Sequence, residues 1–162
     1  VNSTGIMYHC ADLVGYLQKL RRLTNEYAIT SMVILPERIE NEVGVFETDP
    51  ATCVFLPALT PHQREILNAH YSAKFPNMMG LDKISPPVSD ETVSYYVRGG
   101  RMSTAPIWWI ISREALHAMV KICWFSIEEE YVWREHASVL LLKADPPSAD
   151  VAPEGDHISV RK

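Results

Sequence analysis

The stretch that most constrains the fold is residues 106–111, which read PIWWII and end at the polar sequence SRE. It is too short to cross a bilayer as a helix, which needs about 20 apolar residues. As a β-strand it presents apolar side chains on both faces, so both faces have to be covered. A single domain with few helices rarely covers both faces of such a strand. We therefore expect a homodimer, with Trp108, Trp109 and Ile110 as interface candidates.

Three segments carry the signals of helices. Apolar residues recur at helical spacing over residues 11–27, with Asp12 near the start. Thr60 and Gln63 match a capping box, which predicts a helix from Pro61 onward. Ser112 is a suitable N-cap for a third helix directly after the apolar stretch.

The third helix is expected to continue, or to restart, through the acidic run Glu128, Glu129 and Glu130 and on to Arg134. Ser126 and Glu129 have the spacing of a second capping box. Three consecutive carboxylates on a helix point in directions about 100° apart, so they do not converge on one ion. We therefore expect them to form a solvated helix face.

Short β-branched and aromatic runs bounded by turn residues predict strands at residues 29–35, 43–48, 52–56, 92–103, 106–111 and 137–144. The run at 92–103 reads as a hairpin around Gly99 and Gly100. Together with the helices, these strands predict an α+β fold, with α/β as the alternative, containing a mixed sheet of about five to six strands. We expect one globular domain over residues 1–143 and a disordered tail, acidic and rich in proline, over residues 144–162.

Length and composition support a single domain and limit its partners. With 162 residues, of which 47% are hydrophobic, the chain can bury a sizeable core. A net charge of −5 excludes a protein that coats nucleic acid by bulk attraction, although local basic patches stay possible. The three widely spaced cysteines and the lack of a leader pattern predict an intracellular protein that is neither secreted nor inserted in a membrane.

No local motif indicates catalysis. The histidines and cysteines lack the short spacings of a compact zinc site, and no phosphate-binding glycine motif occurs. Cys53 lies in an apolar run, where a thiol usually behaves as a small buried hydrophobe rather than a nucleophile. We therefore expect no catalytic residue, no metal and no cofactor.

The basic residues give the clearest candidates for binding. Arginines on a tight turn can hold phosphates, and tyrosines can stack on bases. The RNA-contact candidates are Arg98, Arg101, Tyr95 and Tyr96 at the hairpin, with Lys19, Arg21 and Arg22 on the first helix. The alternative is that these arginines only solvate a hairpin tip, as the acidic net charge favours.

The segment PALTPHQREILNAHYS, residues 57–72, resembles part of the minor packaging protein of the cystoviruses, the enveloped double-stranded RNA bacteriophages. The resemblance is carried by Ala58, Leu59, Ile66, Leu67, Asn68, His70 and Ser72. It implies a dimeric virion component of the polymerase complex that assists RNA packaging and replication inside the procapsid. Its partners would be viral capsid and polymerase proteins and RNA, and its location the inner core of the virion or the host cytoplasm. The resemblance carries over no catalytic residues.

Two classes of function follow. The first is a non-enzymatic assembly factor that handles RNA and works as a homodimer. The alternative is a small intracellular enzyme or ligand-binding module whose site is built from separate segments, which leave no local motif. Its candidates are the loop at residues 76–90, His70 and the Arg98/Arg101 hairpin.

Overall fold

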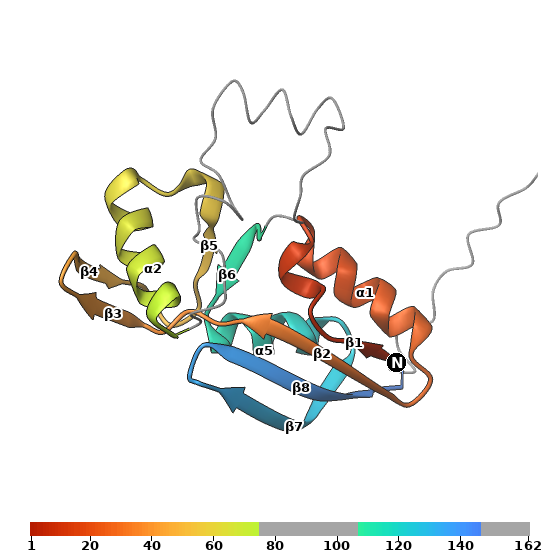
Figure 1. Ribbon diagram of the computed structural model, residues 1–162. Coiled ribbons are helices and arrows are strands. Elements are labelled where there is room, and N and C mark those ends of the chain that lie inside the picture. The colour runs from red at the N-terminus through yellow and green to blue at the C-terminus, as the bar shows by residue number, and fades with distance from the viewer. Residues whose placement is uncertain (75–106, 147–162) are drawn as a thin grey trace, which may run out of the picture.

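The computed structural model describes residues 1–74 and 107–146, and these form an α+β domain (Figure 1). The main sheet has the strand order β1-β2-β8-β7, with β1 parallel to β2 and the other pairs antiparallel. Two small antiparallel pairs, β3–β4 and β5–β6, stand apart from it. The α+β prediction is therefore confirmed, although the strands form three sheets and not one.

The bounds of the elements are as follows. The strands are β1 (Asn2–Ser3), β2 (Tyr27–Val33), β3 (Arg38–Asn41), β4 (Gly44–Glu47), β5 (Cys53–Phe55), β6 (Trp109–Ile111), β7 (Phe125–Trp133) and β8 (Ala137–Ala144). The helices are α1 (Leu13–Leu23), α2 (Pro61–Lys74) and α5 (Arg113–Ile122), with single 3-10 turns η1 (Met7–His9) and η2 (Leu56–Ala58).

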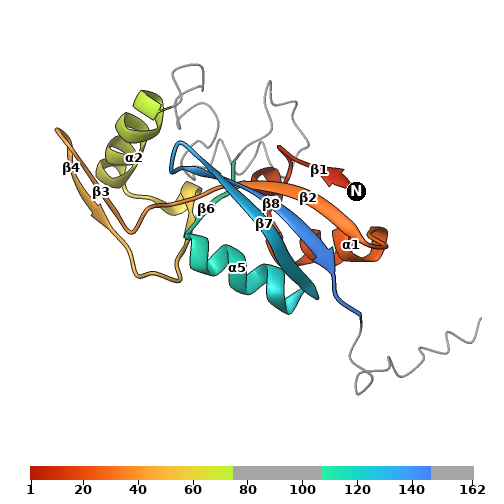
Figure 2. The ribbon, with the colours of Figure 1, turned by 90° about the horizontal axis from the view of Figure 1, so that it is seen from below.

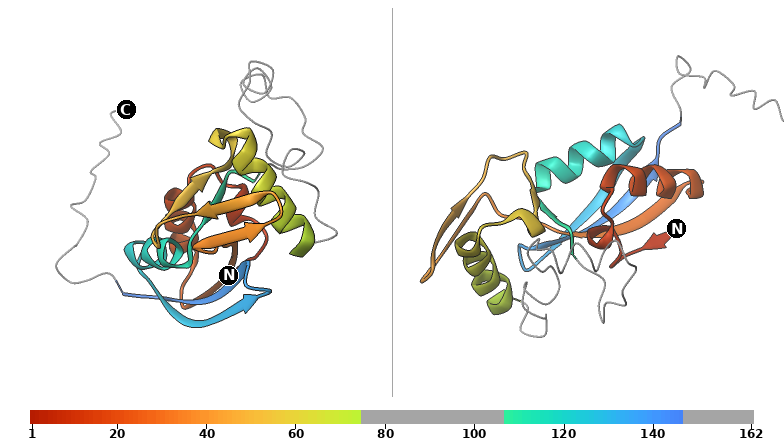
Figure 3. Two further views of the ribbon diagram at one scale, coloured as in Figure 1. Left: turned by 90° about the vertical axis from the view of Figure 1, so that its left-hand side faces the viewer. Right: turned by 90° about the horizontal axis from the view of Figure 1, so that it is seen from above.

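Helices α1 and α5 cover one face of the main sheet (Figures 2 and 3). Both helices are amphipathic, and each buries its apolar stripe against the sheet. The core between them contains Leu13, Leu17 and Leu20 from α1, Leu116 and Val120 from α5, and Ala28, Met32, Phe125, Leu140 and Leu142 from the strands. This core holds β2, β8 and β7 in place.

A second core lies under α2, beside the β3–β4 pair (Figure 1). It contains Ile39 and Phe46 from that pair, Leu56 from η2, Ile66, Leu67 and Tyr71 from α2, and Ile110 from β6. Tyr71 also donates a hydrogen bond of 2.8 Å to the carbonyl of Ile34, just after β2. The two cores therefore meet along β6 and the end of β2.

Residues 109–111 of the apolar stretch form β6, and the same chain buries Ile110 in one core and Ile111 in the other. Ile111 is fully buried in the first core, and Ile110 is buried in the second, with 2% of its surface exposed. No second copy is needed to cover this strand. The two apolar faces of the strand, from which a homodimer was predicted, are therefore no reason to expect one. Ile110 has no surface to offer as an interface residue, whereas Trp108 and Trp109 are partly exposed.

The predicted helix starts are confirmed. The side chains of Asp12 and Ser112 each accept a hydrogen bond from the amide three residues later. Thr60 and Gln63 form the reciprocal pair of a capping box, with the Gln63 amide donating to Thr60 Oγ1 and the Thr60 amide donating to Gln63 Oε1. Local polar signals thus placed the first turns of the three helices in the described part of the chain.

The predicted continuation of the third helix is wrong, because residues 125–133 form strand β7. The helix ends where Trp124 adopts φ 64°, a left-handed conformation that cannot continue a right-handed helix. Residues 125–133 then pair along their length with β8. Pairing with the distant strand β8 outweighs the local helix signal. Ser126 and Glu129 have the spacing of a capping box but lie within strand β7.

Some predictions lie outside the described residues, namely the loop at 76–90, the hairpin at 92–103 and the tail from residue 147 onward. The domain boundary at residue 143 falls short, because Ala144 belongs to β8 and the amide of Asp145 donates to the carbonyl of Trp124. The first helix ends at Leu23, and Tyr27 instead begins β2. None of the described helices is long and apolar enough to cross a membrane.

Candidate interaction surface

The face of the main sheet turned away from α1 and α5 is not covered by any described helix (Figure 2). Alternate residues of β2 and β8 point into the core, so the residues between them point to this open face. The apolar side chains that form the open face are Tyr27 and Ile29 on β2, Val139 and Leu141 on β8, and Tyr131 and Trp133 on β7. Tyr131 is 65% exposed, Trp133 41%, Tyr27 40% and Ile29 37%.

A β-bulge in β7 places its aromatic residues on the open face. Ile127 pairs with Leu142, which points into the core, whereas Glu129 pairs with Leu141, which points outward. The extra residue between them, Glu128, shifts the alternation by one. Without this shift Tyr131 would point into the core, as Phe125 does.

On the core side of β7, Glu130 joins the strand to α5. Its carboxylate accepts hydrogen bonds from Ser138 Oγ at 2.6 Å, Arg113 Nε at 2.8 Å and His117 Nε2 at 3.1 Å. Burial opposes its ionisation, but the hydrogen bonds from Arg113 and Ser138 outweigh burial and hold the pKa of Glu130 below its usual value. The Ser138 hydroxyl and the His117 imidazole each bond to the Glu130 carboxylate, whereas in a catalytic triad the hydroxyl bonds to the imidazole. The cluster holds α5 on the sheet.

Arg21, predicted as an RNA contact, is engaged within the fold. Its guanidinium donates to three backbone carbonyls: those of Trp124 at 3.0 Å, Thr24 at 3.2 Å and Asp145 at 2.5 Å. These bonds join the end of α1 to the α5–β7 turn and to the end of β8. Binding a phosphate would break them, so Arg21 is a structural residue.

Replacing Arg21 with methionine is expected to lower the free energy of unfolding by about 2 kcal/mol. Hydrogen bonds from a charged donor contribute more than neutral ones, and three carbonyls each lose one such bond at once. Urea denaturation followed by far-UV circular dichroism measures the change. The matched control is Arg22→Met one residue later, where the side chain is exposed and a change within about 0.5 kcal/mol is expected. Equal effects of the two substitutions would contradict the structural role of Arg21.

The other RNA-contact candidates are not brought together by the described structure. Lys19 and Arg22 are exposed on α1, three residues apart and so on one side of the helix. Arg98, Arg101, Tyr95 and Tyr96 lie outside the described residues. Their contact with RNA therefore stays a prediction.

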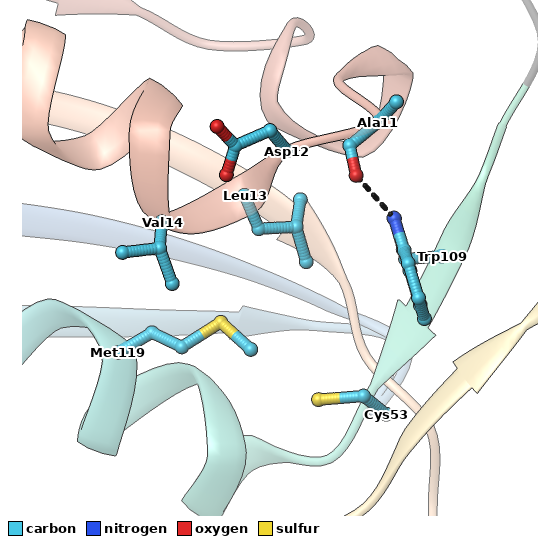
Figure 4. A pocket seen from close by; sticks show the side chains of 7 residues that line it. All are labelled: Ala11, Asp12, Leu13, Val14, Cys53, Trp109 and Met119. Carbon is cyan, nitrogen blue, oxygen red and sulfur yellow. Dashed lines mark hydrogen bonds between the residues drawn. The ribbon is translucent and has the colours of Figure 1, made fainter.

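An apolar hollow of about 230 Å³ opens between the start of α1, strands β5 and β6, and α5 (Figure 4). It is lined by Ala11, Asp12, Leu13, Val14, Cys53, Trp109 and Met119. The Trp109 indole donates to the carbonyl of Ala11 at 2.9 Å and fixes one wall, and the Asp12 carboxylate is occupied in capping α1.

Cys53 is exposed in this hollow, so the expectation that it is buried is wrong. Its strand β5 is short and pairs on one side with β6, which leaves the thiol uncovered. The apolar surroundings nevertheless raise the pKa of the thiol, which keeps it protonated at neutral pH. A protonated thiol is a weak nucleophile, and the described residues that line the hollow include no histidine, lysine or arginine.

His70, a candidate of the alternative site, packs on a buried neighbour. Its ring lies 4.6 Å from the ring of His136, edge to face, and both rings contact Tyr71. Burial lowers the pKa of His136 to about 4, with smaller contributions from His70 and Lys74, so the ring is neutral at pH 7. Within residues 1–74 and 107–146, no group of three histidine, cysteine, aspartate or glutamate side chains is placed to hold a metal ion.

No family model matches the chain, and no curated protein or solved structure is significantly similar to it. Sequence reasoning missed the open face, although residues 137–144 gave a signal: Val139 and Leu141 are apolar on the face opposite Leu140 and Leu142. A strand with apolar residues on both faces calls for cover on both faces.

Proposed function

We propose that this chain is a non-enzymatic assembly factor that works as a homodimer through the open face of its main sheet. The observation that carries the proposal is the exposure of Tyr27, Ile29, Tyr131 and Trp133 on one face. Contiguous apolar surface of this kind marks interaction sites, and aromatic residues are enriched in protein interfaces.

A second copy fits this face because the face is apolar at its centre. Its charged residues, Glu129 and Lys143, lie toward one end, next to Leu141 and Tyr27 in the register. A twofold axis therefore brings apolar surface against apolar surface, as symmetric dimers do. Packing of two such apolar faces needs no charged residues on the partner.

The size of the face sets the expected strength of the dimer. Three strands about 4.8 Å apart, each contributing about seven residues of 3.3 Å, present a few hundred Å². Stable interfaces bury about 800 Å² on each partner. We therefore expect a weak dimer, with a dissociation constant in the micromolar range.

The resemblance of residues 57–72 to the cystovirus packaging protein supplies the biological setting of the proposal. We place the dimer in the polymerase complex of a double-stranded RNA phage, where it assists RNA packaging and replication. Its partners there are capsid and polymerase proteins and RNA, in the inner core of the virion or the host cytoplasm. Lys19 and Arg22 on α1 remain exposed for RNA when the open face is occupied, because α1 lies on the other side of the sheet.

Sedimentation equilibrium over about 1–500 µM tests the dimer. We expect the mean mass of the wild type to rise from 18.4 kDa toward twice that value with concentration. Tyr131→Ser with Trp133→Ser is expected to weaken the dimer at least tenfold, because both aromatic anchors are lost.

The matched control is Leu23→Ser with Ile122→Ser, which removes apolar side chains that are 71% and 64% exposed on α1 and α5. This control is expected to leave the mass unchanged. A wild type that stays monomeric over the whole range would overturn the dimer and favour the ligand-binding alternative.

A further inference from the structure

Among the described residues, strand β7 forms one edge of the main sheet, and the two-residue strand β1 forms the other. Strand β7 is last in the strand order, pairs with β8 on one side, and has no described element along its other side (Figures 1 and 3). An edge strand of this length offers a row of backbone N–H and C=O groups to any extended segment that reaches it. Natural sheets usually block such edges, so an open edge of nine residues calls for an explanation.

The side chains beside this edge form two zones on the open face. The first is acidic: Glu128 and Glu129 are both exposed at the bulge, and Lys143 Nζ lies 4.0 Å from the carboxylate of Glu128. Glu129 forms no ion pair with any described residue. The second zone, toward the end of the strand, is aromatic and consists of Tyr131 and Trp133. An occupant of the edge must complement both zones.

A second copy of β7 is a poor occupant. Two copies paired antiparallel about a twofold axis would bring their acidic residues close to one another across the new ladder. Like charges opposite one another in a sheet are destabilising. The carboxylates therefore act against pairing of β7 with itself, while they attract a cationic strand.

We propose that the edge of β7 binds an extended basic segment of another protein, which adds a fifth, antiparallel strand to the four-stranded sheet. A lysine or arginine of the segment lies opposite Glu129. Because the strands run in opposite directions, apolar or aromatic residues two and four positions before that cation lie opposite Tyr131 and Trp133. The backbone hydrogen bonds supply much of the affinity, and the two zones select the sequence.

The test uses a fluorescent nine-residue peptide with that pattern and the full-length chain. Two further peptides carry N-methyl groups on alternate residues, one at the odd positions and the other at the even positions. A methylated amide cannot donate a hydrogen bond to the neighbouring strand. We expect no binding by the peptide whose methylated amides would face β7. The other methylated peptide is expected to bind with an affinity within about threefold of that of the parent peptide. Fluorescence anisotropy at 50 mM and 500 mM salt measures each affinity, and binding is expected to weaken with salt.

Charge reversal gives the matched test on the protein. Glu128→Lys with Glu129→Lys is expected to weaken the basic peptide about tenfold and to admit a peptide with glutamate in place of the cation. The control, Glu42→Lys with Glu65→Lys, changes the net charge equally at exposed positions away from β7 and is expected to bind as the wild type does.

Three outcomes would overturn the proposal. Equal binding by both N-methylated peptides would show attraction by charge without strand addition. Equal weakening by the control variant would show dependence on net charge alone. Absence of binding to the wild type at low salt would show that the edge accepts no such segment. Tyr131 and Trp133 belong to both surfaces, so the dimer is tested separately, by the mass of the protein without peptide, which these outcomes do not measure.

Discussion

Replacing Phe125 with alanine is expected to lower the free energy of unfolding by about 4 kcal/mol, the largest effect of any single substitution considered. Phe125 is 1% exposed, begins β7 and fills the core between the sheet and α5. Truncating a buried phenylalanine removes its transfer free energy and leaves a cavity, which together cost about 3–5 kcal/mol. Urea denaturation at low protein concentration, where the chain is monomeric, measures the change.

Tyr131→Ala is the matched control on the same strand. Tyr131 is 65% exposed, and its removal is expected to change the free energy of unfolding by no more than about 0.5 kcal/mol. The contrast depends on the bulge at Glu128, because an uninterrupted strand would place residues 125 and 131 on the same face. Similar losses for both variants would contradict the assigned register of β7.

Acidification from pH 7 to pH 4 is expected to destabilise the fold by up to about 3 kcal/mol through His136. Burial lowers the pKa of His136 to about 4, from an ordinary value of about 6.5. The folded state thus takes up the proton less readily than the unfolded state. The stability that the neutral ring confers is complete above pH 6.5, and it is lost progressively as the pH falls toward 4. Among the described residues, the charged or titratable groups around His136 include His70, Tyr71 and Lys74 on α2, and Glu135 before β8.

The measurement is the free energy of unfolding at half-unit steps of pH. The pKa of Glu130 is held below its usual value of 4.5, so ionised Glu130 stabilises the fold above pH 4.5. This stabilisation is lost only as the pH falls below 4.5, which separates it from the loss due to His136 at higher pH. His136→Leu is expected to flatten the profile between pH 6.5 and pH 4.5, and His70→Gln to flatten it in part. A wild-type profile that is already flat in this range would contradict the buried, neutral state of His136.

The sequence predicted those features that depend on neighbouring residues. The predicted caps at Thr60 and Ser112 are local hydrogen bonds between a side chain and an amide three residues later, and both form. Asp12, expected only near the start of the first helix, caps it in the same way. Strands β2, β6 and β8 were found because runs of β-branched and apolar residues signal burial. The α+β class followed from these elements.

Features that depend on residues distant in sequence were missed. Strand β7 carries local helix signals and becomes a strand because β8 pairs with it, and the bulge at Glu128 that turns Tyr131 outward has no local signature. Arg21 looks like a free surface cation until the chain brings the carbonyls of Trp124 and Asp145 to it. The candidate surface shares this origin, because an open face exists only once the order of the strands is known.

Hydroxyl-radical footprinting at about 1 µM and 500 µM protein tests the central claim, that the open face of the main sheet joins two copies, most directly. The modification rates of Tyr27, Tyr131 and Trp133 are expected to fall at least threefold at the higher concentration, when the dimer buries them, while the rates of Leu23 and Ile122 on the helical side stay constant. Unchanged rates at the three aromatic residues, or protection of Leu23 and Ile122 instead, would contradict the claim.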